Sequence, residues 1–541
     1  MSFRRARRAL LLTAAVSVFG LTLSACATDA PAGGNTAEGG EVVWAIEGAN
    51  LSDSHMDPHT SQMDVSSMVQ RQILDSLVWQ NADGSFSPWL AKEWTVSEDG
   101  LTYTFTLRDD VTFHDGEKFT AESVKANFEH IVDPETKSAQ AASMIGGEWY
   151  AGTEVIDEYT VEVKFTQPYA PFLSAASTPL LGFYSTKALE AGTEKLKAGA
   201  PGVNIGTGPF VLSEFIPNQE IVYTRNDDYK WGPQGQEAPS IDTLRVALVL
   251  ESSVRTGMLN SGEAQLVSDL PPSAVGSVDE GATIESKPVP GLPYSLYLNE
   301  KYGVLADQKV REAISLGIDI DTAVDTIFDG QFERAWSILS PSSPGYDASL
   351  ENAWAFDPAA AAALLDEAGW TTLDADGYRT KDGKRLSVRW IAWTPIADEN
   401  KALGVAFQAD LKKIGVELIR EELEPAAYNE QYGPKTFDIT DWSFSGPDSD
   451  LLRSHLHTDG FQNASQVSNP EVDALLEKAI ASSDTDERNG YYTELQQWNA
   501  ADNAIIPIYV PALISAVDGS VDGLAFDVYG RPLFYDVKLD K

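Results

Sequence analysis

Hydrophobic positions recur with a period of two in several short stretches of this chain, and that pattern predicts strands. In residues 101–113, "LTYTFTLRDDVTF", apolar side chains occupy every second position from Leu101 to Leu107. This spacing places them on one face of a half-buried strand. Residues 160–165 and 241–250 are predicted as further strands because they are rich in β-branched and apolar residues.

Other stretches have the spacing and the punctuation of helices. Asp357 and Pro358 supply the N-cap and the first turn of a predicted helix that ends at Gly369. Asn469 and Pro470 begin another, and its apolar residues form a single stripe. Because strand-like and helix-like stretches alternate along the chain, we expect an α/β or α+β body.

The N-terminal segment has the layout of an export signal. Four Arg precede an apolar run over residues 9–23, and small residues then lead to Cys26. The run is too short to span a bilayer comfortably, so we expect a cleaved signal over residues 1–25 rather than a membrane anchor. Arg7 and Arg8 leave the twin-arginine export route open beside the general one.

Cys26 is the only cysteine among the 541 residues, so disulfides cannot stabilise the fold. The tetrapeptide at 23–26, Leu-Ser-Ala-Cys, resembles the lipobox of bacterial lipoproteins, which implies a lipid on Cys26. Residues 26–40 are small, polar and Gly-rich and predict a flexible tether. The lipid would attach the protein to a membrane surface without spanning it.

The net charge excludes one class of partner, and the length of the chain indicates several lobes. The chain has 39 Lys and Arg against 81 Asp and Glu, a net charge of −42 at pH 7. Such a surface repels phosphate backbones, so we exclude nucleic acid as a partner. The globular part, about 500 residues, is too long for one hydrophobic core, and two or three lobes are expected.

Candidate catalytic and metal-binding patterns are weak. His55 and His59 are close in sequence, as are the histidines at 455–457, but Pro58 prevents the helix that would stack the first pair as metal ligands. Residues 206–210, "GTGPF", lack the Lys-Ser/Thr ending of a phosphate loop, and the sequence has no nucleophile motif. We expect no metal, no cofactor and no enzymatic activity; a secreted hydrolase that uses two carboxylates remains the alternative.

Several motifs together resemble one protein family. They occur in the order "DP" (57–58), "PWLAKEW" (88–94), "DGLTYTFTLR" (99–108), "GTGPF" (206–210), "LLDEAGW" (364–370) and "QADLKKIGVEL" (408–418). In this order they resemble the bacterial solute-binding lipoproteins of the peptide/opine/nickel class, extracellular solute-binding family 5. Proteins of this class are the receptors of ABC importers.

The resemblance implies an α/β, periplasmic-binding-protein-like fold of two lobes joined by a hinge, with an inserted subdomain in the first lobe. After the signal and the tether, we expect three parts. Lobe I covers residues 41–290 and contains the inserted subdomain at about 91–205. Lobe II covers 291–500, and residues 501–541 return to lobe I.

The function implied by the resemblance is transport. The protein would capture a small organic ligand between its lobes, either a short peptide or a peptide-like amide compound, aromatic ligands included. It would then deliver the ligand to an ABC permease with ATPase subunits. We expect a monomer at the outer face of the cell membrane. A receptor for an opine or a nickel chelate is one alternative, and a sensory binding protein is another.

The ligand site is expected at residues 441–450, "DWSFSGPDSD". Trp442 matches an aromatic residue that family members place against the ligand, and Ser443, Phe444 and Ser445 would complete the wall. Peptide-binding relatives have at the position of Ser445 an Asp that pairs with the peptide ammonium group. Either bordering acid, Asp441 or Asp448, could substitute for it.

Further wall residues are expected in other parts of the chain. Opine and nickel-chelate receptors hold ligand carboxylates with an Arg in the stretch matching residues 177–184, where this chain has Leu180. The cleft is therefore expected to be aromatic and hydroxyl-rich rather than charged. Ordinary core packing is the alternative for Tyr184 and Trp393. The remaining candidate ligand-binding residues are Gln62, Met63, Tyr184, Asn299 and Trp393.

Overall fold

The computed structural model describes residues 36–37, 39–48, 51, 55–61, 63–138 and 140–540. By its internal contacts the chain divides into residues 1–35 and a compact unit, Thr36–Lys541. The predicted signal, Cys26 and most of the predicted tether lie outside the described residues, as does Gln62. All structural statements below concern the described part of the compact unit.

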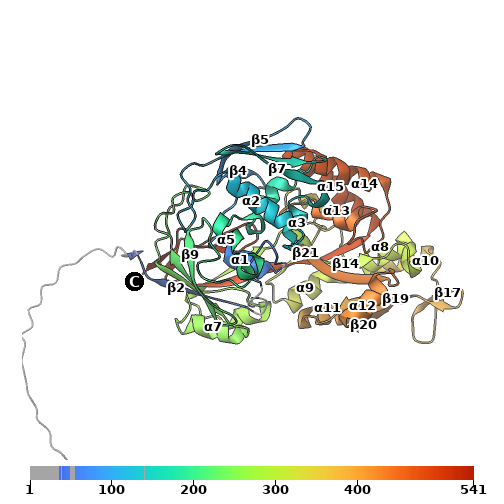
Figure 1. The fold of residues 1–541 in the computed structure, drawn as a ribbon. Coiled ribbons are helices and arrows are strands. Elements are labelled where there is room, and N and C mark those ends of the chain that lie inside the picture. Colours follow the sequence, from blue (N-terminus) through green and yellow to red (C-terminus); the bar gives the residue numbers. More distant parts are fainter. Residues whose placement is uncertain are drawn as a thin grey trace, which may run out of the picture. The chain divides into compact units, whose positions relative to one another are not determined.

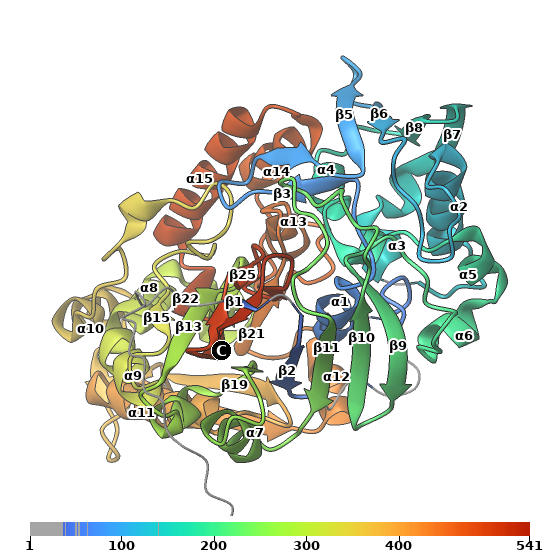
Figure 2. The ribbon, with the colours of Figure 1, turned by 90° about the vertical axis from the view of Figure 1, so that its left-hand side faces the viewer.

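A mixed sheet of seven strands, as far as the chain is described, organises the first large core. Its central strand β2 pairs in parallel with both β11 and β12, and its residues Trp44 and Ile46 are fully buried. Figure 2 shows β2, β11, β10 and β9 side by side. In spatial order the strands are β13 (Ala282–Pro288), β23 (Ala512–Asp518), β12 (Leu266–Val267), β2 (Glu41–Ile46), β11 (Thr243–Leu248), β10 (Glu220–Arg225) and β9 (Phe210–Ile216).

A second mixed sheet, of six described strands, lies between two hydrophobic cores. Its strand β14 is buried along its whole length because helices cover both faces of the sheet. In Figure 1, α13 to α15 lie on one side of β14, and α9 and α11 lie on the other. In spatial order the strands are β15 (Glu333–Arg334), β22 (Ile505–Val510), β14 (Gly291–Leu298), β21 (Ile439–Ser445), β19 (Ser387–Trp393) and β20 (Glu417–Leu423).

The helices around this second sheet begin as the sequence indicates. Asp357 accepts hydrogen bonds from the backbone N–H groups of Ala359 and Ala360, and Asn469 accepts one from Glu471. The two predicted helices are thereby confirmed at their N-termini. The helices are α8 (Gln308–Gly317), α9 (Ile320–Ile327), α10 (Pro358–Glu367), α11 (Asp398–Lys413), α12 (Pro425–Tyr432), α13 (Leu451–Leu456), α14 (Pro470–Ala481) and α15 (Thr485–Asp502).

A smaller antiparallel sheet has its own core and contains the strand predicted from "LTYTFTL". In β6, Tyr103, Phe105 and Leu107 are buried in alternation, as the period of two predicts. The strands are β5 (Ala91–Val96), β6 (Thr102–Leu107), β8 (Thr160–Phe165) and β7 (Tyr150–Asp157). The helices nearby in sequence are α2 (Ala121–Val132), α3 (Gln140–Met144), α4 (Phe172–Ala175), α5 (Thr186–Glu190) and α6 (Thr193–Lys197).

The chain passes between the two large sheets at two adjacent points. Strand β13 of the first sheet leads through Val289 and Pro290 into β14 of the second, and β22 of the second leads through Pro511 back into β23 of the first. The Val289 N–H donates to the Pro511 carbonyl at 2.9 Å, so the two crossover segments lie side by side.

The remaining elements are short. Among the described residues, no helix is both long enough and apolar enough to cross a membrane. Two helices belong here, α1 (Asp64–Gln70) and α7 (Ser252–Asn260), and the strands are β1 (Thr36–Ala37), β3 (Val78–Gln80), β4 (Phe86–Pro88), β16 (Thr372–Leu373), β17 (Arg379–Lys381), β18 (Lys384–Arg385), β24 (Val521–Asp522), β25 (Ala525–Phe526), β26 (Pro532–Leu533) and β27 (Lys538–Asp540).

Candidate functional site

The stretch 441–445 forms the end of β21, beside a crossover segment. Strands β19 and β21 are parallel, so their last residues, Trp393 and Ser445, lie at the same edge of the sheet. Ser445 pairs with Gly291, the first residue of β14. A Cβ at Gly291 would overlap the Phe444 carbonyl oxygen, and its φ of 122° also favours glycine. Ligands of open α/β sheets bind outside the carboxyl ends of the strands, which is this edge.

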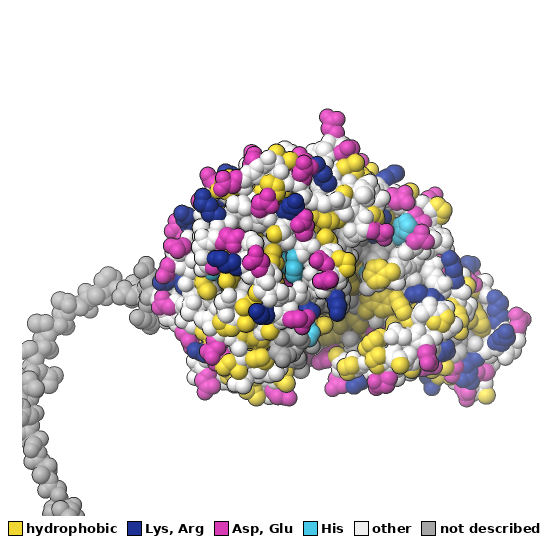
Figure 3. All heavy atoms as spheres, in the orientation of Figure 1, with side chains coloured by type: hydrophobic (Ala, Val, Ile, Leu, Met, Phe, Trp, Pro, Cys, Tyr) yellow, Lys and Arg dark blue, Asp and Glu magenta, His cyan; other side chains and the backbone are white. Residues whose placement is uncertain are grey.

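Exposed aromatic and hydroxyl side chains line this strand end, and we call residues 442–445 the β21 wall. Phe444 is 38% exposed, and Ser443 and Ser445 are exposed beside it. Trp442 is half-buried and stacks on the buried Tyr297 with ring centroids 4.1 Å apart. Figure 3 shows a hollow with hydrophobic side chains gathered in it, over the region where Figure 1 labels β14 and β21.

Trp393 belongs to the same series of aromatic rings. It is 46% exposed and meets Tyr428 edge-on, Tyr428 stacks on Tyr432, and Tyr432 meets Trp442 edge-on. The structure thus connects Trp393 to Trp442, although they are 49 positions apart in sequence.

A buried histidine lies behind the β21 wall. The His455 ring contacts the rings of Trp442 and Phe444 at centroid distances of 6.3 and 5.5 Å. Burial lowers the pKa of His455 to about 4, so its ring is neutral near pH 7. Its Nδ1 lies 2.9 Å from the Leu451 carbonyl and therefore carries the proton, while Nε2 is buried with no hydrogen-bond partner among the described residues.

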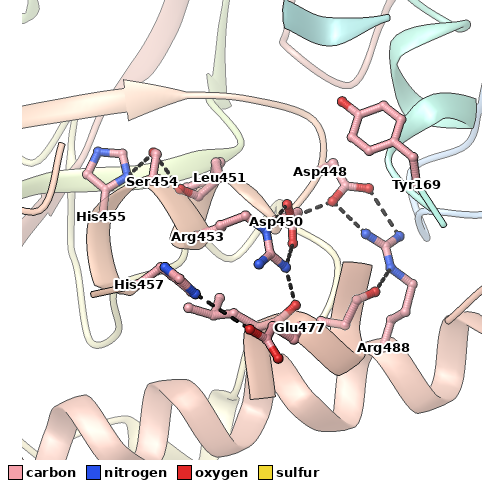
Figure 4. Close-up of polar contacts among 12 residues, drawn as sticks. Tyr169, Asp448, Asp450, Leu451, Arg453, Ser454, His455, His457, Glu477 and Arg488 are labelled. Atoms are coloured by element: carbon pink, nitrogen blue, oxygen red, sulfur yellow. Dashed lines mark hydrogen bonds and ion pairs between the residues drawn. The ribbon is translucent and has the colours of Figure 1, made fainter. Parts of the chain in front are cut away.

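The acids around the β21 wall already have partners. Asp441 accepts hydrogen bonds from the Tyr294 hydroxyl and, at 2.8 Å, from the Trp390 indole. Asp448 accepts from both terminal nitrogens of Arg488, at 3.1 and 2.8 Å (Figure 4). Neither carboxylate is free to replace the acid that is missing at Ser445.

Asp450 is held in the same way. Arg453 donates to both of its carboxylate oxygens at 3.0 Å, and Tyr169 of another part of the chain lies beside Asp448 (Figure 4). Burial raises the pKa of Asp450 and the two arginines oppose that rise. The flanking acids of "DWSFSGPDSD" therefore fix the loop that follows the wall.

The other predicted site residues that the structure describes belong to other elements than β21. Tyr184 is fully buried in the core of the first sheet and meets His59 edge-on at 5.1 Å. Asn299 is buried and donates to the carbonyls of Lys435 and Phe437, at the end of β14 opposite to Gly291. Met63 is half-buried just before α1. Contact of these residues with a ligand stays a prediction.

Sequence reasoning missed a cavity on the side of the first sheet. Its lining includes two buried arginines, Arg71 and Arg531, together with Trp79, Asp527 and Tyr529. These residues come from distant parts of the chain and share no motif, so no local pattern could have connected them.

The histidines do not form a metal site among the described residues. No group of three or more His, Cys, Asp or Glu side chains there is arranged to hold an ion. His59 instead contacts the Gly182 carbonyl at 2.8 Å and His130 at 3.2 Å. Burial lowers the pKa of both histidines to about 4.

Two mixed α/β sheets, joined by two adjacent crossovers with a solvent-accessible wall beside them, define the periplasmic-binding-protein fold. The family model described as bacterial extracellular solute-binding proteins, family 5 (middle region), matches residues 85–463, more than half of the chain. The protein belongs to this family of solute-binding receptors for ABC import.

Relatives support the same assignment over almost the full length. The nickel-binding periplasmic protein of Escherichia coli K12 is 28% identical over 460 residues, which cover 81% of this chain and 84% of the relative. The glutathione-binding protein GsiB of Salmonella paratyphi A is 28% identical over 499 residues, covering 89% and 91%. The crystal structure of NikA from Brucella suis in complex with Fe(III)-EDTA has a TM-score of 0.78 and 26% identity, covering 92% of this chain and 100% of NikA.

Family membership settles three of the expectations. Receptors of this family are non-catalytic, so the alternative of a carboxylate-dependent hydrolase is wrong, and the acids of 441–450 have structural partners instead. The protein binds a small ligand for an ABC transporter, and it acts outside the cytoplasm.

Proposed function

We propose that this protein is a lipid-anchored receptor that captures a short peptide or peptide-like amide between its two lobes and delivers it to an ABC permease. The observation that carries the proposal is the exposed aromatic and hydroxyl wall at the end of β21, next to the crossovers. Flat apolar rings beside adaptable hydroxyl groups suit amide ligands, aromatic ones included.

The two large sheets would be the lobes that close on the ligand. Lobe I would comprise residues 41–290 and 501–541, with the insertion at about 91–205, and lobe II residues 291–500. The crossovers at Val289–Pro290 and Pro511 would act as the hinge, because they are the two adjacent connections between the sheets. A ligand held by both lobes stabilises the closed state through its higher affinity for that state.

The names of the relatives support a small polar ligand but differ in its chemistry. One relative is named for nickel and another for glutathione, which is itself a short peptide. We favour the peptide class because the β21 wall offers hydroxyl groups and aromatic rings to amide ligands. An opine or a metal chelate remains the second candidate.

Binding at the β21 wall is tested by a thermal-shift screen of short peptides and amides on the chain from residue 26. Phe444→Ala should weaken binding of a hit by about tenfold or more, because the exposed ring is lost from the site. Phe461→Ala is the matched control, since Phe461 is 79% exposed and lies outside the wall. Equal affinities of the two variants would place the ligand elsewhere.

The membrane anchor is tested separately. Cys26→Ala should move the protein from the membrane fraction to the soluble fraction without changing its ligand affinity, because only the acylated thiol would be lost. Retention of this variant in the membrane fraction would contradict lipid attachment at Cys26.

A further inference from the structure

We infer that the insertion and the β3–β4 hairpin before it form a latch that holds the two lobes in the arrangement described above. The inference rests on the proposed function, because it uses the lobe boundaries given there, and it adds a connection outside the two crossovers. Three contacts make up this interlobe latch, each from lobe I to lobe II: Ala170 to Ile480, Gln80 to Pro447, and Gly84 to Pro344.

The first contact caps a helix of lobe II. The Ala170 N–H donates to the Ile480 carbonyl at 3.0 Å. Ile480 lies in the last turn of α14, where carbonyl groups have no partner within the helix. Figure 2 shows α4, which begins two residues after Ala170, beside α14. A backbone donor of the insertion therefore satisfies an acceptor of the other lobe.

The second contact joins β3 to the loop that follows the β21 wall. Gln80 is buried, and its Nε2 donates to the Pro447 carbonyl at 3.0 Å. Its Oε1 accepts a hydrogen bond from the Ser174 hydroxyl of α4 at 3.3 Å. Both ends of the amide are thus used, and Gln80 connects the insertion with a loop residue two positions beyond Ser445.

The third contact is a close approach of two loops. A Cβ at Gly84, in the turn between β3 and β4, would lie 2.9 Å from Pro344 Cγ and 3.2 Å from Pro344 Cβ. A side chain at Gly84 would therefore displace Pro344. The Ser449 hydroxyl donates to the Pro344 carbonyl, so Pro344 and the loop after the β21 wall form one surface of lobe II.

Charged residues keep this surface of lobe II in place. Arg488, which binds Asp448, also donates from its Nε to the Ala479 carbonyl at 3.0 Å and so joins the loop to the end of α14. Tyr169 lies beside Asp448 (Figure 4), and its hydroxyl donates to the Met144 carbonyl of the insertion at 3.1 Å. Burial raises the pKa of Tyr169. The Tyr169 ring thus lies beside the ion pair of lobe II while its hydroxyl group is bonded within lobe I.

The insertion is bound more extensively to lobe I than to lobe II. Its hydrophobic core also contains Trp231 and Tyr535 of lobe I, whereas none of the described residues 291–500 belongs to that core. The latch consists of hydrogen bonds and loop packing. Small polar contacts between domains permit relative motion, which a shared hydrophobic core opposes. The insertion therefore moves with lobe I, and the latch can open.

The latch opposes rotation of the lobes about the crossovers. Its contacts come from segments outside the crossovers, so this rotation must break or shift them. Each hydrogen bond of the latch favours the latched arrangement by about fivefold. Because the loop at Pro447 directly follows the β21 wall, a ligand at the wall and the latch act on the same segment of lobe II.

Hydrogen exchange of the Ala170 amide measures the opening of the latch without a ligand. The experiment uses the chain from residue 26 with Cys26→Ala, and mass spectrometry follows a peptide that contains Ala170. Few amides contribute to its signal, because Pro168 and Pro171 on either side carry no N–H. We expect Ala170 to exchange at least about tenfold more slowly than an unprotected amide.

A variant of the second contact shows whether the contacts act together. Gln80→Ala should speed the exchange of Ala170 about fivefold, because the bond to Pro447 is lost. Gln234→Ala is the matched control, since Gln234 is an exposed glutamine of lobe I, and it should leave the exchange unchanged.

An engineered disulfide tests the latch in the opposite direction. Gly84→Cys with Pro344→Cys places two Cβ atoms 3.2 Å apart, slightly closer than in a disulfide, so a small loop shift allows the bond. With Cys26→Ala no other cysteine competes. Oxidation should slow the exchange of Ala170 at least about tenfold, and reduction should restore it. Both redox states share the strain of a side chain at Gly84, so their comparison is valid even if Gln80→Ala folds poorly.

Four outcomes would overturn the inference. Ala170 could exchange as fast as an unprotected amide, or the cysteine pair could fail to form a disulfide under oxidation. The oxidised and reduced forms could exchange at the same rate, or folded Gln80→Ala could exchange at the rate of the parent protein. None of these measurements uses a ligand, so an error in the proposed ligand class would leave the latch unaffected.

Discussion

The acids beside the β21 wall and the arginines in the first-sheet cavity differ in what their neighbours leave unused. Asp441 and Asp448 each accept two hydrogen bonds from side chains of their own half of the molecule. Arg71 and Arg531 have partners as well, but each retains a buried donor. The hydrogen-bonding capacity of these acids is thus used within the fold, whereas each arginine keeps one buried N–H that no described residue accepts.

The largest effect on stability is expected from breaking the ion pair between Asp448 and Arg488. Asp448→Asn leaves Arg488, whose side chain is 14% exposed, without its ionic partner. The free energy of unfolding should fall by about 3 kcal/mol, because an unpaired buried charge is costly. Urea unfolding measures it. Asp398→Asn, in an ion pair whose acid is 93% exposed, should change the value by less than about 0.5 kcal/mol.

If Asp448→Asn and Asp398→Asn lowered the free energy of unfolding by similar amounts, the Asp448–Arg488 pair would not be structural. The acid would then be available to a ligand, and the contrast with the arginines would disappear.

Within the aromatic series, the half-buried ring should matter more for stability than the exposed one. Trp442→Ala removes the stack on buried Tyr297 and should cost about 2–3 kcal/mol in urea unfolding. Trp393→Ala, at a position 46% exposed, should cost less than about 1 kcal/mol. The reverse order would mean that Trp393 supports the fold and Trp442 is available to the ligand alone.

The stability of the folded protein depends on pH through the buried His455 behind the β21 wall. Its pKa is about 4 in the folded protein and about 6.5 when unfolded, so the unfolded state binds the extra proton as pH falls. The contribution of His455 to stability is constant above pH 6.5 and is lost as pH falls toward 4, by about 2 kcal/mol at pH 5. His455→Gln should therefore lose less stability than the native protein between pH 7 and pH 5.

The comparison with the variant is needed because other groups act in the opposite sense. Burial raises the pKa of Asp57 to about 6 and that of Asp75 to about 7, so both stabilise the fold on acidification. These groups are common to both proteins and cancel in the difference. Equal slopes for the two proteins would mean that His455 does not titrate as a buried group.

The smallest effect on stability is expected at the exposed end of the wall. Ser445→Asp introduces an acid at the position where the family resemblance implies one in peptide-binding receptors, and it should change the free energy of unfolding by less than about 0.5 kcal/mol. Affinity for a dipeptide with a free ammonium group should rise about fivefold relative to its N-acetyl form. Calorimetry with Ala-Phe and N-acetyl-Ala-Phe measures it, and Ser443→Asp is the matched control. An equal gain in both variants would refute a specific ammonium position at Ser445.

Local sequence patterns predicted several strands and helices, because the side-chain alternation and the capping that define these elements involve neighbouring residues. The stretch 160–165 coincides with β8, and the caps at Asp357 and Asn469 begin helices where expected. Of the predicted site residues, 442–445 form the end of a strand with exposed side chains, whereas Tyr184 and Asn299 are buried; contact of any of them with a ligand stays a prediction. An apolar or amide side chain has the same sequence signal in a core and in a cleft.

By itself the sequence determined several of the strands and helices and the family, since periodicity, capping and ordered motifs are properties of neighbouring residues. Only the tertiary structure decided which charges remain available. Asp448 is paired with Arg488, and Arg71 and Arg531 line one cavity although they lie far apart in the sequence. Burial and hydrogen-bond satisfaction depend on contacts between distant segments, and these contacts decide which side chains can bind a ligand.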